Sequence, residues 1–361
     1  MKNEGSALLL EAIILYCLKQ IDRERTINSI YHLLLGKPSI QTIQDAHLYG
    51  LERFYALYKT LDKRSFAEQV KQLNENSYIE HVSHEHFVVT VKGKTMLEKF
   101  DLAKYYWNGM KFHQIDSAFF ERLLLFIQVW TNAKNHNFRY IPIVENPKTL
   151  HWAKRLFHRE PKNYDVRLKQ LYEELVRIFD KLPPIYPEMF IRQITTAEKI
   201  GLTFEQLANA LNKPVSDIRL LHMNYVHFML EELSAYPKQY PLLSSFVQGL
   251  NDATNETTLT NSANITLSYI KRGFPLAEIA KRRKLKLNTI YDHIVEIALH
   301  DDNFPIEPFV SREKQDEIFK AAEKLKTRKL KLIKEAVGED IDYFQIRLAL
   351  TKRHRSNGEK R

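Results

Sequence analysis

The stretch Asn261–Leu299, NSANITLSYIKRGFPLAEIAKRRKLKLNTIYDHIVEIAL, decides the fold expected for the C-terminal part of this chain. Its apolar residues recur at helical spacing in runs separated by Gly273-Phe274-Pro275 and by the basic turn Lys284-Leu285-Lys286-Leu287. Two short amphipathic helices joined by a tight turn are typical of a helix-turn-helix. We expect the small Ala280 where the two helices cross, because a larger side chain would push them apart.

The start of the second helix contains the residues expected to contact DNA, because this part of a helix-turn-helix enters the major groove. On its outer face we expect Asn288, Thr289, Asp292 and His293. The cations expected to contact phosphates around the turn are Arg282, Arg283, Lys284 and Lys286. Lys271 and Arg272, just before the Gly-Phe-Pro break, are further candidates for phosphate contacts.

The same segment resembles the helicase helix-turn-helix domain, which occurs at the C-terminal end of some RecQ-type DNA helicases. The matching patterns are G-x-P-L-x-E-I-A-x-x-R at Gly273–Arg283, T-I-x-x-H-I at Thr289–Ile294, and the closing helices at Lys329–Leu350. The stretch Thr26–Leu51 looks like the opening of stand-alone proteins encoded beside a RecQ-type helicase in Gram-positive bacteria (the YpbB type). The resemblance implies an accessory that supplies a DNA-binding module in trans to a RecQ-family helicase, in DNA repair or recombination.

The net charge supports a nucleic-acid partner. It is +10 for the chain, and residues 261–361 contain 22 Lys and Arg against 15 Asp and Glu, so most of the excess lies there. A basic excess around a groove-reading motif is the electrostatic pattern of nucleic-acid binding. The alternative is that the basic excess is an ordinary lysine-rich surface in contact with solvent, without a nucleic-acid partner.

Composition indicates a folded, mainly α-helical protein of the cytoplasm. Hydrophobic residues make up 44% and charged residues 27%, with only 10 Gly and 13 Pro in 361 residues. The single cysteine, Cys17, suits a reducing compartment. The apolar run 7–18 contains Glu11 and is too short to span a bilayer, so we expect no membrane contact and a cytoplasmic, nucleoid-associated protein.

The pattern predicts an N-terminal winged-helix-like domain over residues 1–100. Helical runs precede two β-rich stretches, Ser77–Glu80 and Phe87–Val91, and a helix resumes at Thr95. Such a wing would contact phosphates through Lys92 and Lys94, or the domain would serve as a docking platform for a protein.

Further domains follow from the helical pattern. Residues 101–250 read as an all-helical middle domain, with a weaker helix-turn-helix-like copy at 203–230, 72 residues before the C-terminal motif. Its outer face is less basic, so a structural role is expected. A linker at 251–264, the helix-turn-helix domain at 265–350 and a basic tail at 351–361 complete the organisation.

No catalytic, cofactor or metal site is expected. Gly93-Lys94-Thr95 ends like a phosphate loop, but Val88 stands where the first glycine is required. His81, His84 and His86 lack a fourth ligand, so a solvated turn is expected in place of a zinc site. Without helicase motor motifs or a recognisable nucleophile, the chain is not expected to be an enzyme or to have a small-molecule substrate.

Two other functions remain open: a sequence-specific transcriptional regulator, and a helical interaction scaffold without DNA contact. Within the accessory reading, residues 1–250 are expected to bind the helicase and the remainder to bind DNA. That division rests on an N-terminal set of aromatic residues expected at the surface. They are Tyr49, Phe54, Tyr55, Tyr58, Tyr105, Tyr106 and Trp107.

Overall fold

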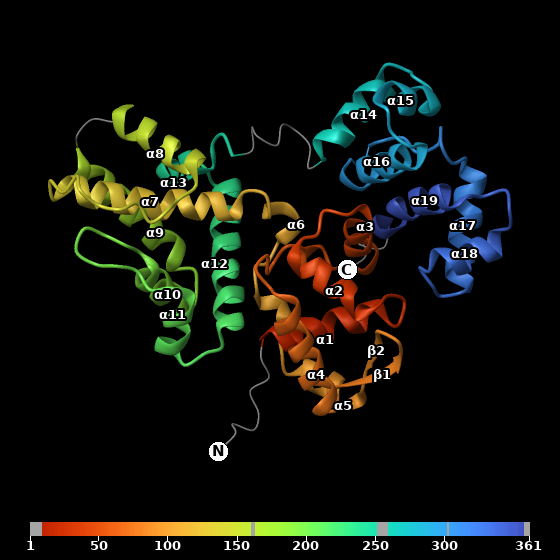
Figure 1. The fold of residues 1–361 in the computed structure, drawn as a ribbon, viewed down its shortest axis with the longest axis horizontal. Coiled ribbons are helices and arrows are strands. Elements are labelled where there is room, and N and C mark those ends of the chain that lie inside the picture. Colours follow the sequence, from red (N-terminus) through yellow and green to blue (C-terminus); the bar gives the residue numbers. More distant parts are fainter. Residues whose placement is uncertain (1–8, 160–162, 251–258, 302, 357–361) are drawn as a thin grey trace. The chain divides into compact units, whose positions relative to one another are not determined.

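The computed structural model describes residues 9–159, 163–250, 259–301 and 303–356. Within these residues it confirms a mainly α-helical fold, with 19 α-helices and one two-stranded antiparallel hairpin (Figure 1). The chain forms two compact units. The middle unit comprises Met1–Ile13 and Met96–Asn255, and the terminal unit combines Ile14–Thr95 with Glu256–Arg361. Residues 251–258 of the expected linker and 357–361 of the expected basic tail lie outside the described residues.

The N-terminal segment of the terminal unit is a set of short helices ending in the hairpin. Its elements are α1 (Leu9–Ile21, which begins in the middle unit), α2 (Ile27–Leu35), α3 (Ile40–Tyr49), η1 (Glu52–Phe54), α4 (Lys63–Glu75), β1 (Ile79–Ser83), β2 (His86–Val89) and α5 (Val91–Glu98, whose last residues belong to the middle unit). Ser39 caps α3 by accepting the N–H of Thr42, and Gly50 ends the helix with a left-handed backbone. The chain leaves α2 at Gly36, where a side chain would collide with Ala56.

The hairpin differs from the predicted wing at its ends. β1 and β2 pair with Ile79 opposite Val89, and α5 begins at Val91, four residues before the predicted helix start at Thr95. The Thr90 hydroxyl accepts the N–H of Gly93 at 3.1 Å and donates to the Ser77 carbonyl at 2.7 Å, so it caps the new helix. The second strand therefore ends at Val89, before the predicted end at Val91.

The C-terminal segment of the terminal unit surrounds one helix. Its elements are α14 (Asn261–Lys271), α15 (Leu276–Arg283), α16 (Leu287–His300), α17 (Arg312–Lys324), α18 (Leu330–Val337) and α19 (Tyr343–Ser356). The central α16 packs against α14, α15 and α19, and also against α3 from the N-terminal segment (Figure 1). Helix α3 thus packs on the helices of the C-terminal motif.

The middle unit is a helical layer packed on aromatic side chains. Its elements are η2 (Leu102–Lys104), α6 (Gly109–Phe112), α7 (Asp116–Lys134), α8 (Pro147–Arg159), α9 (Tyr164–Phe179), α10 (Ile185–Gln193), α11 (Phe204–Leu211), α12 (Val215–Ala235) and α13 (Pro241–Val247). Along α7, Phe126 stacks on Trp130 at 4.0 Å and contacts Phe246 of α13 at 5.0 Å between ring centroids. All three rings are almost fully buried.

The helix pair α11–α12 repeats the local geometry of α15–α16. Asn212 and Lys284, 72 residues apart, both adopt a left-handed backbone, with φ of 50° and 52°, and each ends an eight-residue helix. The residue after each donates its N–H back to the buried alanine of the preceding helix, Ala208 or Ala280. The same turn therefore occurs in both compact units.

The prediction that seven N-terminal aromatic residues lie at the surface is wrong for most of them. Tyr49, Phe54, Tyr55 and Trp107 are at most 4% exposed, and only Tyr106, at 47%, is largely accessible. Trp107 donates its indole N–H to the Leu220 carbonyl at 2.9 Å inside the middle unit. The large apolar area of these rings places them in the core, so they do not form an interface.

Candidate nucleic-acid interface

Helices α14, α15 and α16 form a compact three-helix motif. Lys284 ends α15, and its N–H and that of Leu285 return to the carbonyls of Lys281 and Ala280, at 3.2 and 2.9 Å. Lys286 then precedes the first turn of α16, so the connection between the helices is only three residues long. This is the tight turn that the sequence predicts.

The inner faces of the motif are apolar and closely packed. Ile279, Ile290 and Ile294 have no exposed surface, Ala280 is 8% exposed, and α15 packs against α16. The position of Ala280 at the helix crossing stays a prediction, since a small side chain there would let the two helices approach. The motif is therefore a rigid element on which exposed residues hold fixed positions.

Six exposed cations lie on α15 and on the chain just before and just after it, and we call them the basic corner. They are Lys271, Arg272, Lys281, Arg282, Lys284 and Lys286. Of the six, only Arg282 pairs with a carboxylate within the part of the chain that the structure describes, reaching Glu278 at 2.6 Å. Lys281 was missed by sequence reasoning, although the run Lys281–Lys284 provided the signal.

The start of α16 directly follows the turn, beside Lys284 and Lys286. Asn288 is exposed, Thr289 is half-buried, and Leu287 is 38% exposed. The N-terminal end of a helix has a partial positive charge from its unpaired N–H groups, which favours phosphate. This region therefore combines exposed cations, a helix dipole and two short polar side chains, which is the combination that a groove-reading helix needs.

Arg283 does not belong to the basic corner. Its guanidinium donates to the backbone carbonyl of Ser262 at 2.7 Å and to that residue's hydroxyl at 2.9 Å, and it also contacts the Thr266 hydroxyl. Partial burial lowers its pKa. Arg283 thus ties the end of α15 to the start of α14, and the structure gives it a structural contact where a phosphate contact was expected.

The placement of His293 on the outer face is also wrong. His293 is 7% exposed, and its Nδ1 lies 2.8 Å from the hydroxyl of the buried Thr266. Successive residues of a helix turn by about 100°, so His293 lies only about 60° from the inward-facing Ile290. Burial, followed by the charge of Arg283, lowers the pKa of His293. It serves as a neutral packing and hydrogen-bonding group.

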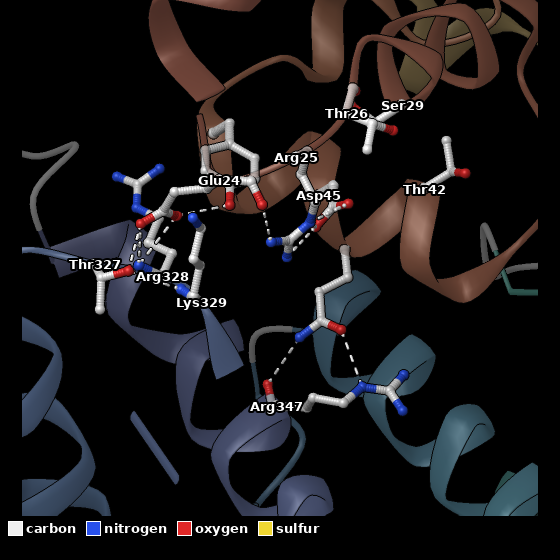
Figure 2. Close-up of polar contacts among 12 residues, drawn as sticks. Glu24, Arg25, Thr26, Ser29, Thr42, Asp45, Thr327, Arg328, Lys329 and Arg347 are labelled. Atoms are coloured by element: carbon white, nitrogen blue, oxygen red, sulfur yellow. Dashed lines mark hydrogen bonds and ion pairs between the residues drawn. The ribbon is translucent and has the colours of Figure 1, made fainter. Parts of the chain in front are cut away.

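Asp292 points outward, but it is paired. Arg347 on α19 donates to it, with 2.7 Å between Nη1 and Oδ1. Arg347 also donates from Nε to the Gln44 side chain of α3 at 3.1 Å, and Gln44 returns a bond to the Arg347 carbonyl at 3.3 Å (Figure 2). These contacts connect α16 through α19 to α3.

A second polar cluster connects the same two segments of the terminal unit. The Glu24 carboxylate accepts the hydroxyl of Thr327 at 2.5 Å and the N–H of Arg328 at 2.8 Å (Figure 2). Arg25 beside it forms a bidentate pair with Asp45 of α3, with N–O distances of 2.8 to 3.0 Å. Polar side chains of the N-terminal segment therefore bind the stretch from α17 to α19 of the C-terminal segment across about 300 positions in sequence.

Lys92 and Lys94 lie on α5, beside the hairpin. The ammonium of Lys92 donates to the Asn76 carbonyl at 2.8 Å and lies 5.0 Å from the centre of the Tyr78 ring. Lys94 is exposed.

Within the described residues no group of three or more His, Cys, Asp or Glu side chains is arranged to hold a metal ion. No helix in those residues is long and apolar enough to cross a membrane.

This geometry places the chain among the helix-turn-helix proteins, a class whose architecture suggests DNA binding. A family model described as a helix-turn-helix domain matches residues 262–350. The chain is 32% identical over 347 residues to protein YpbB of Bacillus subtilis (strain 168), an alignment that covers 95% of the chain and 97% of that protein. The chain therefore belongs to the YpbB family. No solved structure matches it.

Proposed function

We propose that this protein binds DNA through the start of α16 and the basic corner. The observation that carries the proposal is the group of five cations without a carboxylate partner among the described residues, three of them (Lys281, Lys284 and Lys286) at the turn of a helix-turn-helix and two (Lys271 and Arg272) before its first helix. In this arrangement the corner neutralises phosphates and fixes the register, while Asn288 and Thr289 face the base edges. Lys92 and Lys94 on α5 add a second group of phosphate contacts.

We further propose that the protein acts as a non-enzymatic accessory of a RecQ-family helicase at the nucleoid, in DNA repair or recombination. Membership of the YpbB family and the helix-turn-helix domain support this role. The accessory binds the helicase and supplies in trans a substrate-gripping module. Tethering such a module to a motor raises its effective concentration at the substrate without new chemistry.

The DNA contact is tested in the full chain by reversing three corner charges. Lys281→Glu/Lys284→Glu/Lys286→Glu should weaken binding to a labelled duplex by at least about tenfold, because three phosphate contacts are lost. The matched control is Lys63→Glu/Arg64→Glu/Lys71→Glu on α4, where all three residues are exposed in the same unit. Equal loss of binding in both triple variants would contradict the interface.

The helicase partnership is tested by affinity purification of the full chain from native cells. We expect a RecQ-family helicase to co-purify, and we expect added protein to raise that helicase's affinity for forked DNA. Recovery of DNA without any helicase would contradict the partnership and leave the DNA contact standing.

A transcriptional regulator is the second candidate, because Asn288 is exposed at the start of a groove-reading helix. Asn288→Ala and Thr289→Ala distinguish the two functions. For a regulator, each substitution should reduce the discrimination against wrong bases at one base pair by about 1–3 kcal/mol of binding free energy. For a helicase accessory, binding should depend on DNA structure and hardly on sequence.

A further inference from the structure

The middle unit has a basic surface that the sequence analysis did not detect. Residues 134–159 contain six Lys and Arg against one Glu, and α8 has no acidic residue. The cations on α8 are Lys148, Lys154, Arg155 and Arg159, and all four are exposed. None of the four pairs with a carboxylate within the described residues, whereas Lys134 nearby pairs with Asp165 at 2.6 Å.

A hollow lined partly by aromatic residues lies beside one of these cations, Lys154. It has a volume of about 330 Å³, and its wall includes Phe138, Tyr140 and Phe157 together with Lys154 of α8. Phe138 is 65% exposed, and Arg139 lies between the two aromatic residues of the loop. Three aromatic side chains and one cation, Lys154, therefore line the same hollow.

The loop that carries Phe138 is held in place by buried hydrogen bonds. Gln128 of α7, 3% exposed, donates to the Ile141 carbonyl at 3.0 Å and accepts the N–H of Ile143 at 3.0 Å. Asn137, at the start of the loop, donates to the Asn132 side chain at 2.8 Å. The exposed ring is thus presented by a fixed backbone, and it does not collapse onto the core.

We propose that α8 and this hollow form a binding site for single-stranded DNA, separate from the helix-turn-helix. Proteins bind single strands by combining cations that follow the phosphates with aromatic rings on which bases stack. A base can enter the hollow only when it is not stacked inside a duplex, so the geometry favours a single strand. The cations extend along three turns of α8, beyond the hollow, which suits a polyanion better than a short acidic peptide.

The test uses the full chain and a fluorescein-labelled dT30 oligonucleotide. Lys154→Glu/Arg155→Glu should weaken binding at least about tenfold and reduce the salt slope by about 1.4, because two phosphate contacts are lost. Phe138→Ala should weaken binding at least about fivefold through lost stacking. Both changes lie on exposed side chains, and unchanged thermal unfolding confirms that the variants fold.

Matched controls come from the same unit. Lys169→Glu/Lys238→Glu makes the same charge change at exposed positions, and Tyr172→Ala removes a ring that is 68% exposed on α9. Both controls should bind dT30 within about twofold of the unchanged chain, as surface changes outside a site do. Equal losses in controls and site variants would overturn the proposal.

Three other results would also overturn it. If rU30 binds more tightly than dT30, the surface is an RNA site. If the α8 variants no longer bind an acidic peptide of alternating Glu, Leu, Asp and Phe but still bind dT30, the hollow is a peptide site. If only Lys281→Glu/Lys284→Glu/Lys286→Glu weakens dT30 binding, the single strand binds at the basic corner. None of these three results would affect the duplex contact proposed for the helix-turn-helix.

Discussion

The guanidinium of Arg347 on α19 contacts the carboxylate of Asp292 on α16, with 2.7 Å between Nη1 and Oδ1. This pair neutralises the one acidic side chain on the expected DNA-contacting face of the motif. It also anchors α16 to α3, through the two hydrogen bonds between Arg347 and Gln44. Arg347 therefore orients the recognition helix and reduces its repulsion of phosphate.

Removing Arg347 should weaken DNA binding even though Arg347 is expected to make no base contact. Arg347→Ala leaves Asp292 unpaired next to the DNA, and we expect a several-fold loss of duplex affinity. Adding Asp292→Asn should restore most of that affinity, and a double-mutant cycle should give a coupling of about 0.5–1 kcal/mol in unfolding free energy. The control is Arg312→Ala on α17, because the Arg312 side chain is 83% exposed. Failure of Asp292→Asn to restore binding would contradict the electrostatic role.

Arg282 and Arg283 are adjacent and should behave in opposite ways. Arg283→Ala removes hydrogen bonds to Ser262 and Thr266, so the unfolding free energy should fall by about 1–3 kcal/mol. Arg282→Ala removes an exposed cation, so duplex affinity should fall while stability changes by less than about 0.5 kcal/mol. Chemical denaturation and fluorescence anisotropy measure the two effects. A stability loss confined to Arg282→Ala would show that the assignment is reversed.

Enlarging Ala280 should destabilise the motif. Ala280→Leu overpacks the contact between α15 and α16, at a cost of about 1–3 kcal/mol. Ala277→Leu, on the exposed face of the same helix, is the matched control and should change stability by less than about 0.5 kcal/mol. Equal unfolding midpoints for the two variants would mean that the helices do not cross at Ala280.

Stability should fall in acid partly because of His222 in the middle unit. Burial lowers the pKa of His222 from 6.5 to about 3, because the charged imidazole would lose its hydration. The unfolded state therefore takes up a proton that the folded state excludes between those two pH values. The stabilising contribution is complete above pH 6.5 and is lost progressively as the pH falls toward 3.

The measurement is the unfolding free energy of the unchanged chain and of His222→Gln at several pH values. Below pH 6.5 the unchanged chain should lose up to about 1.4 kcal/mol more per pH unit than the variant. Glutamine retains a polar group near the Tyr225 hydroxyl, which lies 2.7 Å from His222 Nδ1. Identical pH slopes for the two proteins would exclude His222 as the source.

Local features of the motif could be predicted from the sequence because they depend on residues close together. The apolar spacing around Ile279 and Ile290 predicted both helices, and the basic run predicted the exposed turn between them. The inward position of His293 was missed because four elements cover α16, and its buried face is wider than a two-helix contact requires. The role of Arg283 depends on Ser262, which lies on another helix and leaves no local signal.

The long-range organisation could not be predicted for a related reason. Nothing in the local pattern of Glu24 or Gln44 indicates that these residues meet Arg328 and Arg347, about 300 positions away. The pairing of 14–95 with 256–361 also changes how the division between helicase binding and DNA binding can be tested. A fragment that begins at 261 would lose α3 and expose the apolar faces that α3 covers. Substitutions in the full chain avoid this problem.

The central claim is that the basic corner binds DNA phosphates, and the salt dependence of duplex binding tests it most directly. With about three to five phosphates neutralised, log affinity of the full chain should fall against log salt with a slope of roughly −2.7 to −4.5. In Lys281→Glu/Lys284→Glu/Lys286→Glu the slope should become shallower by up to about 2.7, while the α4 control keeps the original slope. An unchanged slope in the corner variant, or no salt dependence in the full chain, would contradict the account.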